Sequence, residues 1–183
     1  MNKGDIVSNT AFSEKKIYPN LFMIVAMTEK TNSIGLNGDM LYHLKDDLRY
    51  YKEKTQNHNI ICGRKTYFSF PIRPLPNRTN IVLTTSEQDF DGCITMSSLD
   101  DVLDYVEKRP DEYFFVSGGE NIYRQFMDYS SKLYITIIDE KEDVISDTVF
   151  PEIDNDIWEV KSISEYIRPD SAPNYRYFIF DRK

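Results

Sequence analysis

Two places in this chain of 183 residues share one local order, in which a short apolar segment runs into glycine and then into the start of a helix-like segment. The first is Ile60-Ile61-Cys62 before Gly63, and the second is Tyr113 to Val116 before Ser117-Gly118-Gly119. Apolar runs without alternation are typical of strands buried on both faces of a parallel sheet, which require helical crossovers. The repeated junction therefore predicts an α/β fold in which a ligand approaches backbone at the glycines.

Other segments complete this sheet. Leu21 to Met27 is a continuous apolar run and is expected to be a central strand, while helical spacing predicts a helix from Leu44 to about Thr55. Trp158 to Ser164 and Tyr175 to Phe180 alternate apolar with polar residues, which favours an antiparallel hairpin. We expect a single, mostly parallel, twisted central sheet with flanking helices and this C-terminal antiparallel hairpin.

The chain is long enough for one domain with a sizeable core and too short to expect two. Residues 1–20 are polar without a clear period, so we interpret them as an N-terminal extension, either a flexible arm or an added surface segment, before a domain at 21–183. The order of a signal peptide and the apolar run of a membrane span are both missing, which indicates the cytoplasm. The formal net charge of −8 argues against a nucleic-acid partner.

Cys62 and Cys93 have no second Cys or His at the spacing of metal ligands, so we expect no metal site. Asp47 lies on the apolar stripe formed by Leu44, Leu48 and Tyr51 at helical spacing. Two interpretations of this acid stay open. It is either an ordinary first-turn charge favoured by the helix dipole or a partly desolvated acid facing a cleft.

The first glycine junction also carries charge. Arg64 and Lys65 open the helix after Gly63, where cations oppose the helix dipole, so an anionic group is expected to compensate them. This makes Gly63 to Thr66 a candidate phosphate site, with two solvated basic residues as the alternative. Thr84-Thr85-Ser86 at the end of the next apolar strand offers three further hydroxyls.

In order, these motifs resemble those of dihydrofolate reductase, over about residues 22–180. The stretches that carry the resemblance are Ile24-Val25-Ala26, Ile34-Gly35 with Asn37-Gly38-Asp39-Met40, Leu44 to Tyr51, Gly63 to Thr66, Arg73 to Pro76 with Arg78, Ser117-Gly118-Gly119 with Tyr123, Leu133 to Thr136, and Asp147-Thr148 with Phe150-Pro151. No single stretch is specific, but eight of them in the expected order are.

The resemblance implies reduction of 7,8-dihydrofolate to tetrahydrofolate with NADPH, in support of one-carbon metabolism. We expect a monomer that acts on this small molecule, without a nucleic-acid or membrane partner. Two other functions remain open: a related pterin or pyrimidine reductase of the riboflavin-pathway type, and a non-catalytic folate- or nucleotide-binding module. Arg78 favours folate over the substrate of a riboflavin-pathway reductase, and an intact Asp47 argues against a non-catalytic binding module.

For the substrate, the resemblance implies that Asp47 holds the pterin edge and assists its protonation, with Thr136 and Tyr42 in the same network. Arg78 would pair with the carboxylate of the glutamate tail, a role suited to a bidentate donor. The other residues expected to line the substrate are Ile24, Val25, Ala26, Leu48, Tyr51, Phe70, Leu75, Ser117 and Tyr123.

For NADPH, Arg64 and Thr85 are expected to meet the 2′-phosphate, and the loop from Gly35 to Met40 is expected to close over the nicotinamide. The full set of expected cofactor residues is Ala26, Ile34, Gly35, Asn37, Gly38, Asp39, Met40, Gly63, Arg64, Lys65, Thr66, Leu83, Thr84, Thr85, Gly118, Gly119, Glu120, Asn121 and Ile122.

The chain also departs from the family pattern. Tyr42 stands where the family usually has Trp, Ser117 replaces an aliphatic residue of the pterin pocket, and Glu120 replaces a small residue beside the pyrophosphate. Because Tyr42 and Ser117 reshape the pterin pocket, we predict weakened binding of diaminopyrimidine antifolates.

Overall fold

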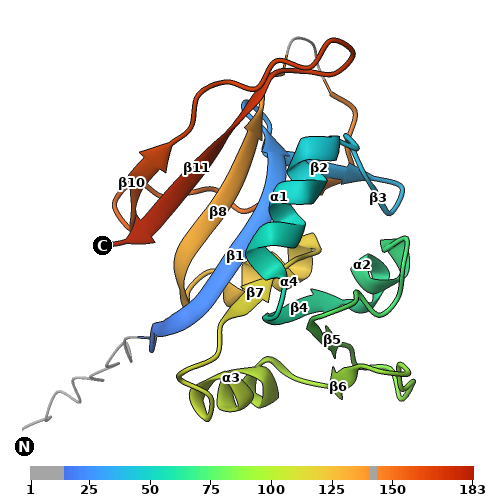
Figure 1. Ribbon diagram of the computed structural model, residues 1–183. Coiled ribbons are helices and arrows are strands. Elements are labelled where there is room, and N and C mark those ends of the chain that lie inside the picture. Colours follow the sequence, from blue (N-terminus) through green and yellow to red (C-terminus); the bar gives the residue numbers. More distant parts are fainter. Residues whose placement is uncertain (1–14, 141–143) are drawn as a thin grey trace, which may run out of the picture.

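A computed structural model describes residues 15–140 and 144–183 and contains an eight-stranded sheet in the order β10-β11-β8-β1-β7-β4-β5-β6 (Figure 1). In chain order the elements are β1 Tyr18–Thr28, β2 Ser33–Leu36, β3 Asp39–Met40, α1 Lys45–Thr55, β4 Asn59–Gly63, α2 Arg64–Ser69, β5 Thr79–Leu83, β6 Ile94–Met96, α3 Leu99–Glu107, β7 Phe114–Val116, α4 Glu120–Phe126, β8 Ser130–Ile138, β9 Thr148–Val149, β10 Trp158–Ile163 and β11 Tyr175–Arg182.

The sheet is mostly parallel. β1 pairs in parallel with both β7 and β8, and β4 continues the sheet in parallel through β5 to β6. Only β11 runs against its neighbours, because it pairs antiparallel with β8 on one side and with β10 on the other. This confirms the expected fold, including the C-terminal antiparallel hairpin.

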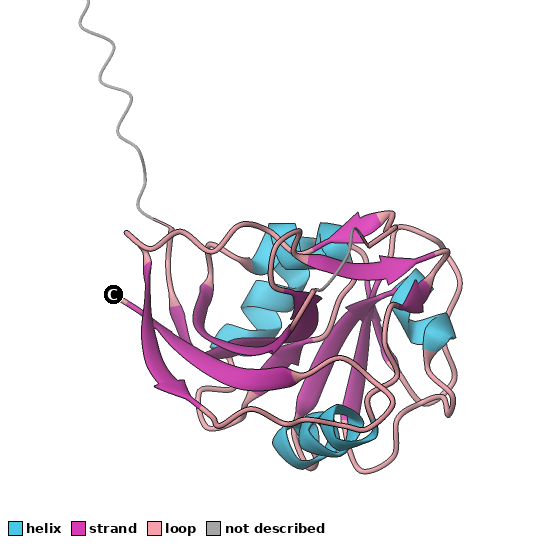
Figure 2. Cartoon of the chain, turned by 90° about the horizontal axis from the view of Figure 1, so that it is seen from above, coloured by secondary structure: helices cyan, strands magenta, loops and turns pink. Residues whose placement is uncertain are grey.

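Helices cover both faces of the sheet (Figure 2). The larger apolar cluster joins inward side chains of β1, such as Leu21 and Met23, to Val102 of α3 and Phe126 of α4. On the opposite face, Phe22 and Ile24 pack with aromatic residues of α1, and a further cluster joins β4 and β5 to α2. Side chains of β1 therefore alternate between the two helical layers, as a strand buried on both faces requires.

The first strand begins at Tyr18 rather than at Leu21, so the sheet takes in three residues that the sequence pattern assigns to the extension. Tyr18 is buried, and its N–H donates a hydrogen bond to the carbonyl of Tyr129. Because Asn20 is polar, the apolar pattern does not show that the strand begins before Leu21. The Asn20 side chain is nevertheless buried, and it donates hydrogen bonds to the carbonyls of Arg109 and Glu112. Residues 1–14 of the expected extension lie outside the described residues.

The loop expected from Gly35 to Met40 is a hairpin formed by β2 and β3, with Asn37 and Gly38 as its two-residue turn. Both turn residues have positive φ, 54° and 82°, the combination that a type I′ turn requires. β2 also pairs with β9, a strand of two residues within an acidic segment. In the part of the chain that the structure describes, no helix is long and apolar enough to span a membrane.

Candidate active site

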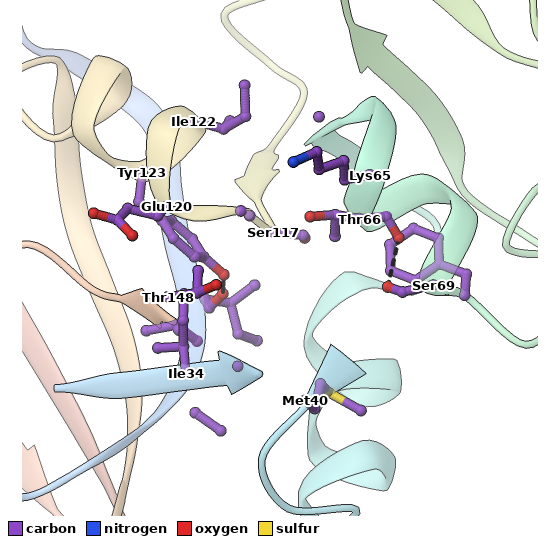
Figure 3. A pocket seen from close by; sticks show the side chains of 18 of the residues that line it. Ile34, Met40, Lys65, Thr66, Ser69, Ser117, Glu120, Ile122, Tyr123 and Thr148 are labelled. Carbon is purple, nitrogen blue, oxygen red and sulfur yellow. Dashed lines mark hydrogen bonds between the residues drawn. The ribbon is translucent and has the colours of Figure 1, made fainter. Parts of the chain in front are cut away.

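A cavity of about 950 Å³ lies along the carboxyl ends of the parallel strands, between α1, α2, α4 and the β2–β3 hairpin. Figure 3 shows three of these walls, with Ile34 and Met40 on the hairpin side, Lys65 and Thr66 on α2, and Glu120 at the start of α4. The carboxyl ends of strands are where open α/β sheets bind their ligands. All residues expected at the site line this cavity except Asn37, which sits at the tip of the hairpin.

One end of the cavity is acidic. Asp47, in the first turn of α1, is partly buried and accepts a hydrogen bond of 2.5 Å from the hydroxyl of Thr136 on β8. Burial raises the pKa of Asp47 to about 6, and the hydrogen bond from Thr136 offsets part of that rise. The carboxyl group therefore exchanges a proton near neutral pH, which an ordinary first-turn aspartate does not do.

A second hydrogen-bonded pair of side chains, both hydroxyls, lies in the wall of the cavity. Tyr51 of α1 donates a hydrogen bond of 3.0 Å to Ser117, and the Ser117 hydroxyl donates in turn to the carbonyl of Phe115 at 3.4 Å. Nearby, the Tyr123 hydroxyl donates to the carbonyl of Ile24 at 2.8 Å. These contacts join α1, β7, α4 and β1 through polar atoms within an otherwise aromatic and aliphatic wall.

The end of this half of the cavity opposite Asp47 is basic. Arg78 is partly buried, and its guanidinium donates to the Thr55 hydroxyl and to the carbonyl of Pro76, both at 3.1 Å. Burial lowers the pKa of Arg78, although the group remains a cation at any physiological pH. Thr55 is itself held by a hydrogen bond to the carbonyl of Tyr51, so the arginine is oriented from α1.

The two glycine junctions meet in the other half of the cavity. The N–H of Gly63 donates to the carbonyl of Gly118 at 2.8 Å, and the peptide bond between Gly118 and Gly119 is cis. A methyl group added at Gly63 would lie 3.0 Å from Ile122, and one added at Gly119 would lie 3.3 Å from the Thr66 hydroxyl. The junctions therefore leave backbone, rather than side chains, facing the cavity between α2 and α4.

Basic and hydroxyl groups surround these junctions. Arg64 and Lys65 are exposed at the start of α2, and Thr84 and Thr85 follow the end of β5. All four residues line the cavity. Among the described residues Arg64 and Lys65 form no salt bridge, so their charges remain available to an anionic ligand.

The hairpin that faces α2 across the cavity is fixed at its tip. The N–H of Asn37 donates to the carboxylate of Asp147 at 2.8 Å, which ties the hairpin tip to the residue that precedes β9. Glu120 also holds this region, because its carboxylate pairs with Arg124 at 2.8 Å and accepts the N–H of Val149 on β9 at 3.1 Å. The hydrogen bond from Arg124 lowers the pKa of Glu120.

Several residues of the wall carried no expectation from the sequence. Lys52 lies four positions after Leu48, so helical spacing alone would have placed it at the cavity edge. Ser33 and Thr148 offered no comparable signal, because only the pairing of β2 with β9 brings them to the cavity. Tyr42 lines the cavity as expected and packs against Leu44, Ile138 and Tyr175.

The half of the cavity around the glycine junctions forms a cradle of backbone with basic groups beside it, and it adjoins the chamber that holds the partly buried Asp47. This arrangement is typical of an α/β reductase that holds a dinucleotide next to its substrate. The family model described as "Dihydrofolate reductase" matches residues 20–182. The chain belongs to the dihydrofolate reductase family.

Individual proteins agree with this assignment. The dihydrofolate reductase of Bacillus subtilis is 39% identical over 152 residues, covering 82% of this chain and 88% of that protein. The dihydrofolate reductase of Haemophilus influenzae is 35% identical, covering 88% of this chain and 99% of that protein. A structure of the Enterococcus faecalis dihydrofolate reductase, complexed with NADP(H) and RAB-propyl, superposes with a TM-score of 0.81 at 31% identity, covering 91% of this chain and 98% of that one.

Proposed function

We propose that this protein reduces 7,8-dihydrofolate to 5,6,7,8-tetrahydrofolate with NADPH, and that Asp47 assists protonation of the pterin. The observation that carries the proposal is the buried carboxyl of Asp47, held by Thr136 and with its pKa raised to about 6. A group with such a pKa holds a proton in a useful fraction of molecules near neutral pH, as acid catalysis requires. The nicotinamide of NADPH supplies the hydride when it is bound.

The cradle suits a dinucleotide pyrophosphate. Side chains at Gly63 and Gly119 would crowd Ile122 and Thr66, so glycine is what allows the two junctions to pack this closely beside the cavity. In the proposed complex Thr66 and the backbone at the start of α4 hold the pyrophosphate, while Arg64 and Thr85 meet the 2′-phosphate. The β2–β3 hairpin then covers the nicotinamide end and excludes water.

On the substrate side, Asp47 binds the amino-pyrimidine edge of the pterin, and Arg78 pairs with the carboxylate of the glutamate tail. Tyr42 takes part in the same proton network from the hairpin end of the chamber. Phe70, Leu75 and Leu48 cover the ring system between the two charged ends.

The test is the loss of NADPH absorbance in the presence of dihydrofolate. Rapid turnover is expected. Tight NADPH binding without any turnover would overturn the proposal and indicate a non-catalytic binding module. Turnover of a riboflavin-pathway pyrimidine in place of dihydrofolate would also overturn it and assign the chain to the related reductases. Parallel assays with NADH are expected to show much weaker activity, because NADH lacks the phosphate that Arg64 and Thr85 meet.

We also propose that the enzyme acts as a cytoplasmic monomer without a nucleic-acid partner. The net charge of −8 supports the last point, since phosphate backbones bind basic surfaces. Sedimentation of the full chain at several concentrations is expected to give a single species of the mass of one chain, 21.6 kDa. A concentration-dependent mass would contradict the monomer.

A further inference from the structure

Glu140 is a buried acid outside the cavity, two residues beyond the end of β8. Its residue is only 6% exposed. One carboxylate oxygen accepts the backbone N–H groups of Lys30 and Thr31 at 3.2 and 3.3 Å, and the other accepts the Thr31 hydroxyl at 3.1 Å. Lys30 and Thr31 belong to the turn that joins β1 to β2, so the acid ties this turn to the end of β8.

A chain of hydroxyl groups continues from this contact toward the cavity. The Thr31 hydroxyl lies 2.9 Å from that of Thr28 and 2.8 Å from that of Ser33, and the Ser33 hydroxyl lies 2.7 Å from that of Ser146. Thr28 and Ser33 are both buried. Ser33 is the first residue of β2 and lines the cavity, so Glu140 is connected to the stem of the β2–β3 hairpin through two hydroxyls.

The carboxylate is held in its charged form. Burial alone would raise the pKa of Glu140, but hydrogen bonds from the Thr31 and Thr28 hydroxyls and from the N–H groups of Lys30 and Val144 keep it below the ordinary value. The N–H groups of Lys30 and Thr31 and the Thr31 hydroxyl all donate to the carboxylate. An acceptor is therefore required opposite the N–H groups of Lys30 and Thr31, because a donor there would face other donors.

We propose that Glu140 is a positioning residue for the reaction, which fixes the stem of the β2–β3 hairpin so that the hairpin can cover the bound cofactor. This inference rests on the proposed function of the hairpin at the nicotinamide. Glu140 touches neither the cavity nor a reacting group. It acts through Thr31 and Ser33, and its loss would loosen the hairpin while leaving the substrate half of the cavity, with Asp47 and Arg78, in place.

The test compares Glu140→Gln with Glu29→Gln. Gln has the shape of Glu but only one acceptor oxygen, so its N–H₂ group must face either the N–H groups of Lys30 and Thr31 or the Thr31 hydroxyl, where the carboxylate offers an acceptor to both. Glu29 is exposed and lies in the same turn, so it serves as the matched control. For Glu140→Gln we expect the KM for NADPH to rise about fivefold to tenfold, with the KM for dihydrofolate nearly unchanged. Backbone amides of residues 33–40 are expected to exchange hydrogen faster.

A second pair of variants keeps the test usable if Glu140→Gln fails to fold. Thr31→Val removes the hydroxyl that joins Glu140 to Ser33, whereas Thr31→Ser keeps it, and Thr31 is exposed enough to tolerate either change. Thr31→Val is expected to reproduce the rise in the KM for NADPH, and Thr31→Ser is expected to behave like the unmodified enzyme.

The outcomes separate this inference from the proposed function. If the unmodified protein does not turn over dihydrofolate, the proposed function fails whatever the exchange data show. If it does, faster exchange at residues 33–40 without a change in the KM for NADPH overturns the positioning role. An equal rise in both KM values also overturns it, because that result indicates a general loss of structure.

Discussion

The hydroxyl of Thr136 on β8 donates a hydrogen bond to the carboxylate of Asp47 on α1, across 89 positions of sequence. This contact joins the central sheet to the helix that covers one of its faces, at the acidic end of the cavity. Burial raises the pKa of this carboxyl to about 6, the hydrogen bond offsets part of that rise, and most of the chemistry expected of this enzyme depends on the resulting value.

Replacing Asp47 with Asn is expected to lower kcat about 100-fold or more, because a positioned proton-handling group contributes on that scale. In the unmodified enzyme kcat/KM should fall as the pH rises above about 6, where Asp47 loses its proton. Steady-state assays across this range check both expectations. The matched control is Asp46→Asn, since Asp46 is exposed and paired with Arg49, and the idea fails if both variants lose activity equally.

The same substitution is expected to stabilise the folded protein at neutral pH. The pKa of Asp47 is higher in the folded chain than its ordinary value of 3.8, so the folded state binds more protons between about pH 4 and 6. The contribution of this group to the free energy of unfolding therefore falls as the pH rises through that window. Asp47→Asn removes this loss of stability, which amounts to up to roughly 3 kcal/mol in the free energy of unfolding.

Denaturant unfolding of both proteins at neutral pH and at about pH 4 measures the effect. The gain from Asp47→Asn should be largest at neutral pH and should vanish at the acidic end. A constant difference across both conditions would mean that burial of the charge is not its cause.

The hydrogen bond between Tyr51 and Ser117 is expected to show strong coupling between the two residues. Ser117→Ala leaves the Tyr51 hydroxyl without its partner, at a cost of about 1 to 2 kcal/mol, whereas Tyr51→Phe leaves Ser117 bonded to Phe115. The double variant should recover about 1 kcal/mol relative to the sum of the single changes. It should also bind a diaminopyrimidine antifolate more tightly than the unmodified enzyme does. Strictly additive free energies of unfolding would show that the two hydroxyls act separately.

Arg78→Lys is expected to raise the KM for dihydrofolate at least about tenfold, since an ammonium cannot form the two parallel hydrogen bonds of a guanidinium with a carboxylate. The KM for NADPH should not change. Arg73→Lys is the control, because Arg73 is exposed and donates to the carbonyl of Phe68 outside the cavity. The difference between the Arg78 variant and the unmodified enzyme should disappear with a dihydropterin that lacks the glutamate tail, and its persistence would rule out the assigned contact.

Gly38→Ala is expected to weaken the β2–β3 hairpin by about 1 kcal/mol, because Gly38 has φ of +82°, a conformation that alanine rarely adopts. There is open space around Gly38, so a clash would not explain the result. The expected readout is a higher KM for NADPH with little change in the KM for dihydrofolate. Asn37→Gly, at the neighbouring position of positive φ, should be tolerated, and equal effects of the two changes would contradict the explanation.

Much of the fold could be predicted because its central strands are continuous apolar runs separated by clear turn residues. The run from Leu21 to Met27 and the glycines at Gly63 and Gly118 were sufficient to indicate a parallel sheet with a ligand at the strand ends. β9 was missed since Thr148 and Val149 are only two residues within an acidic segment, and their pairing with β2 depends on tertiary contacts.

The site shows a similar division. Helical spacing placed Asp47 on an apolar stripe but left its role open, because the deciding hydrogen bond comes from Thr136, far away in the sequence. Leu48, expected on the buried stripe, is 42% exposed and meets the cavity instead of the core. The contact of Tyr51 with Ser117 and the burial of Glu140 had no local signal at all, since each depends on two segments that meet only in the folded chain.

The central place of β1 has a consequence for synthesis of the chain. This strand is synthesised before the other strands of the sheet, yet its neighbours β7 and β8 lie about a hundred residues later in the chain. Leu21 is paired with Phe114, and Phe22 is paired with Lys132. A nascent chain that has emerged from the ribosome only as far as α3 would expose the strongly apolar β1 strand, with both of its edges unpaired and open to other molecules. Productive folding must therefore wait for most of the polypeptide to leave the ribosome, and the emerging first strand is the segment in greatest need of protection by chaperones.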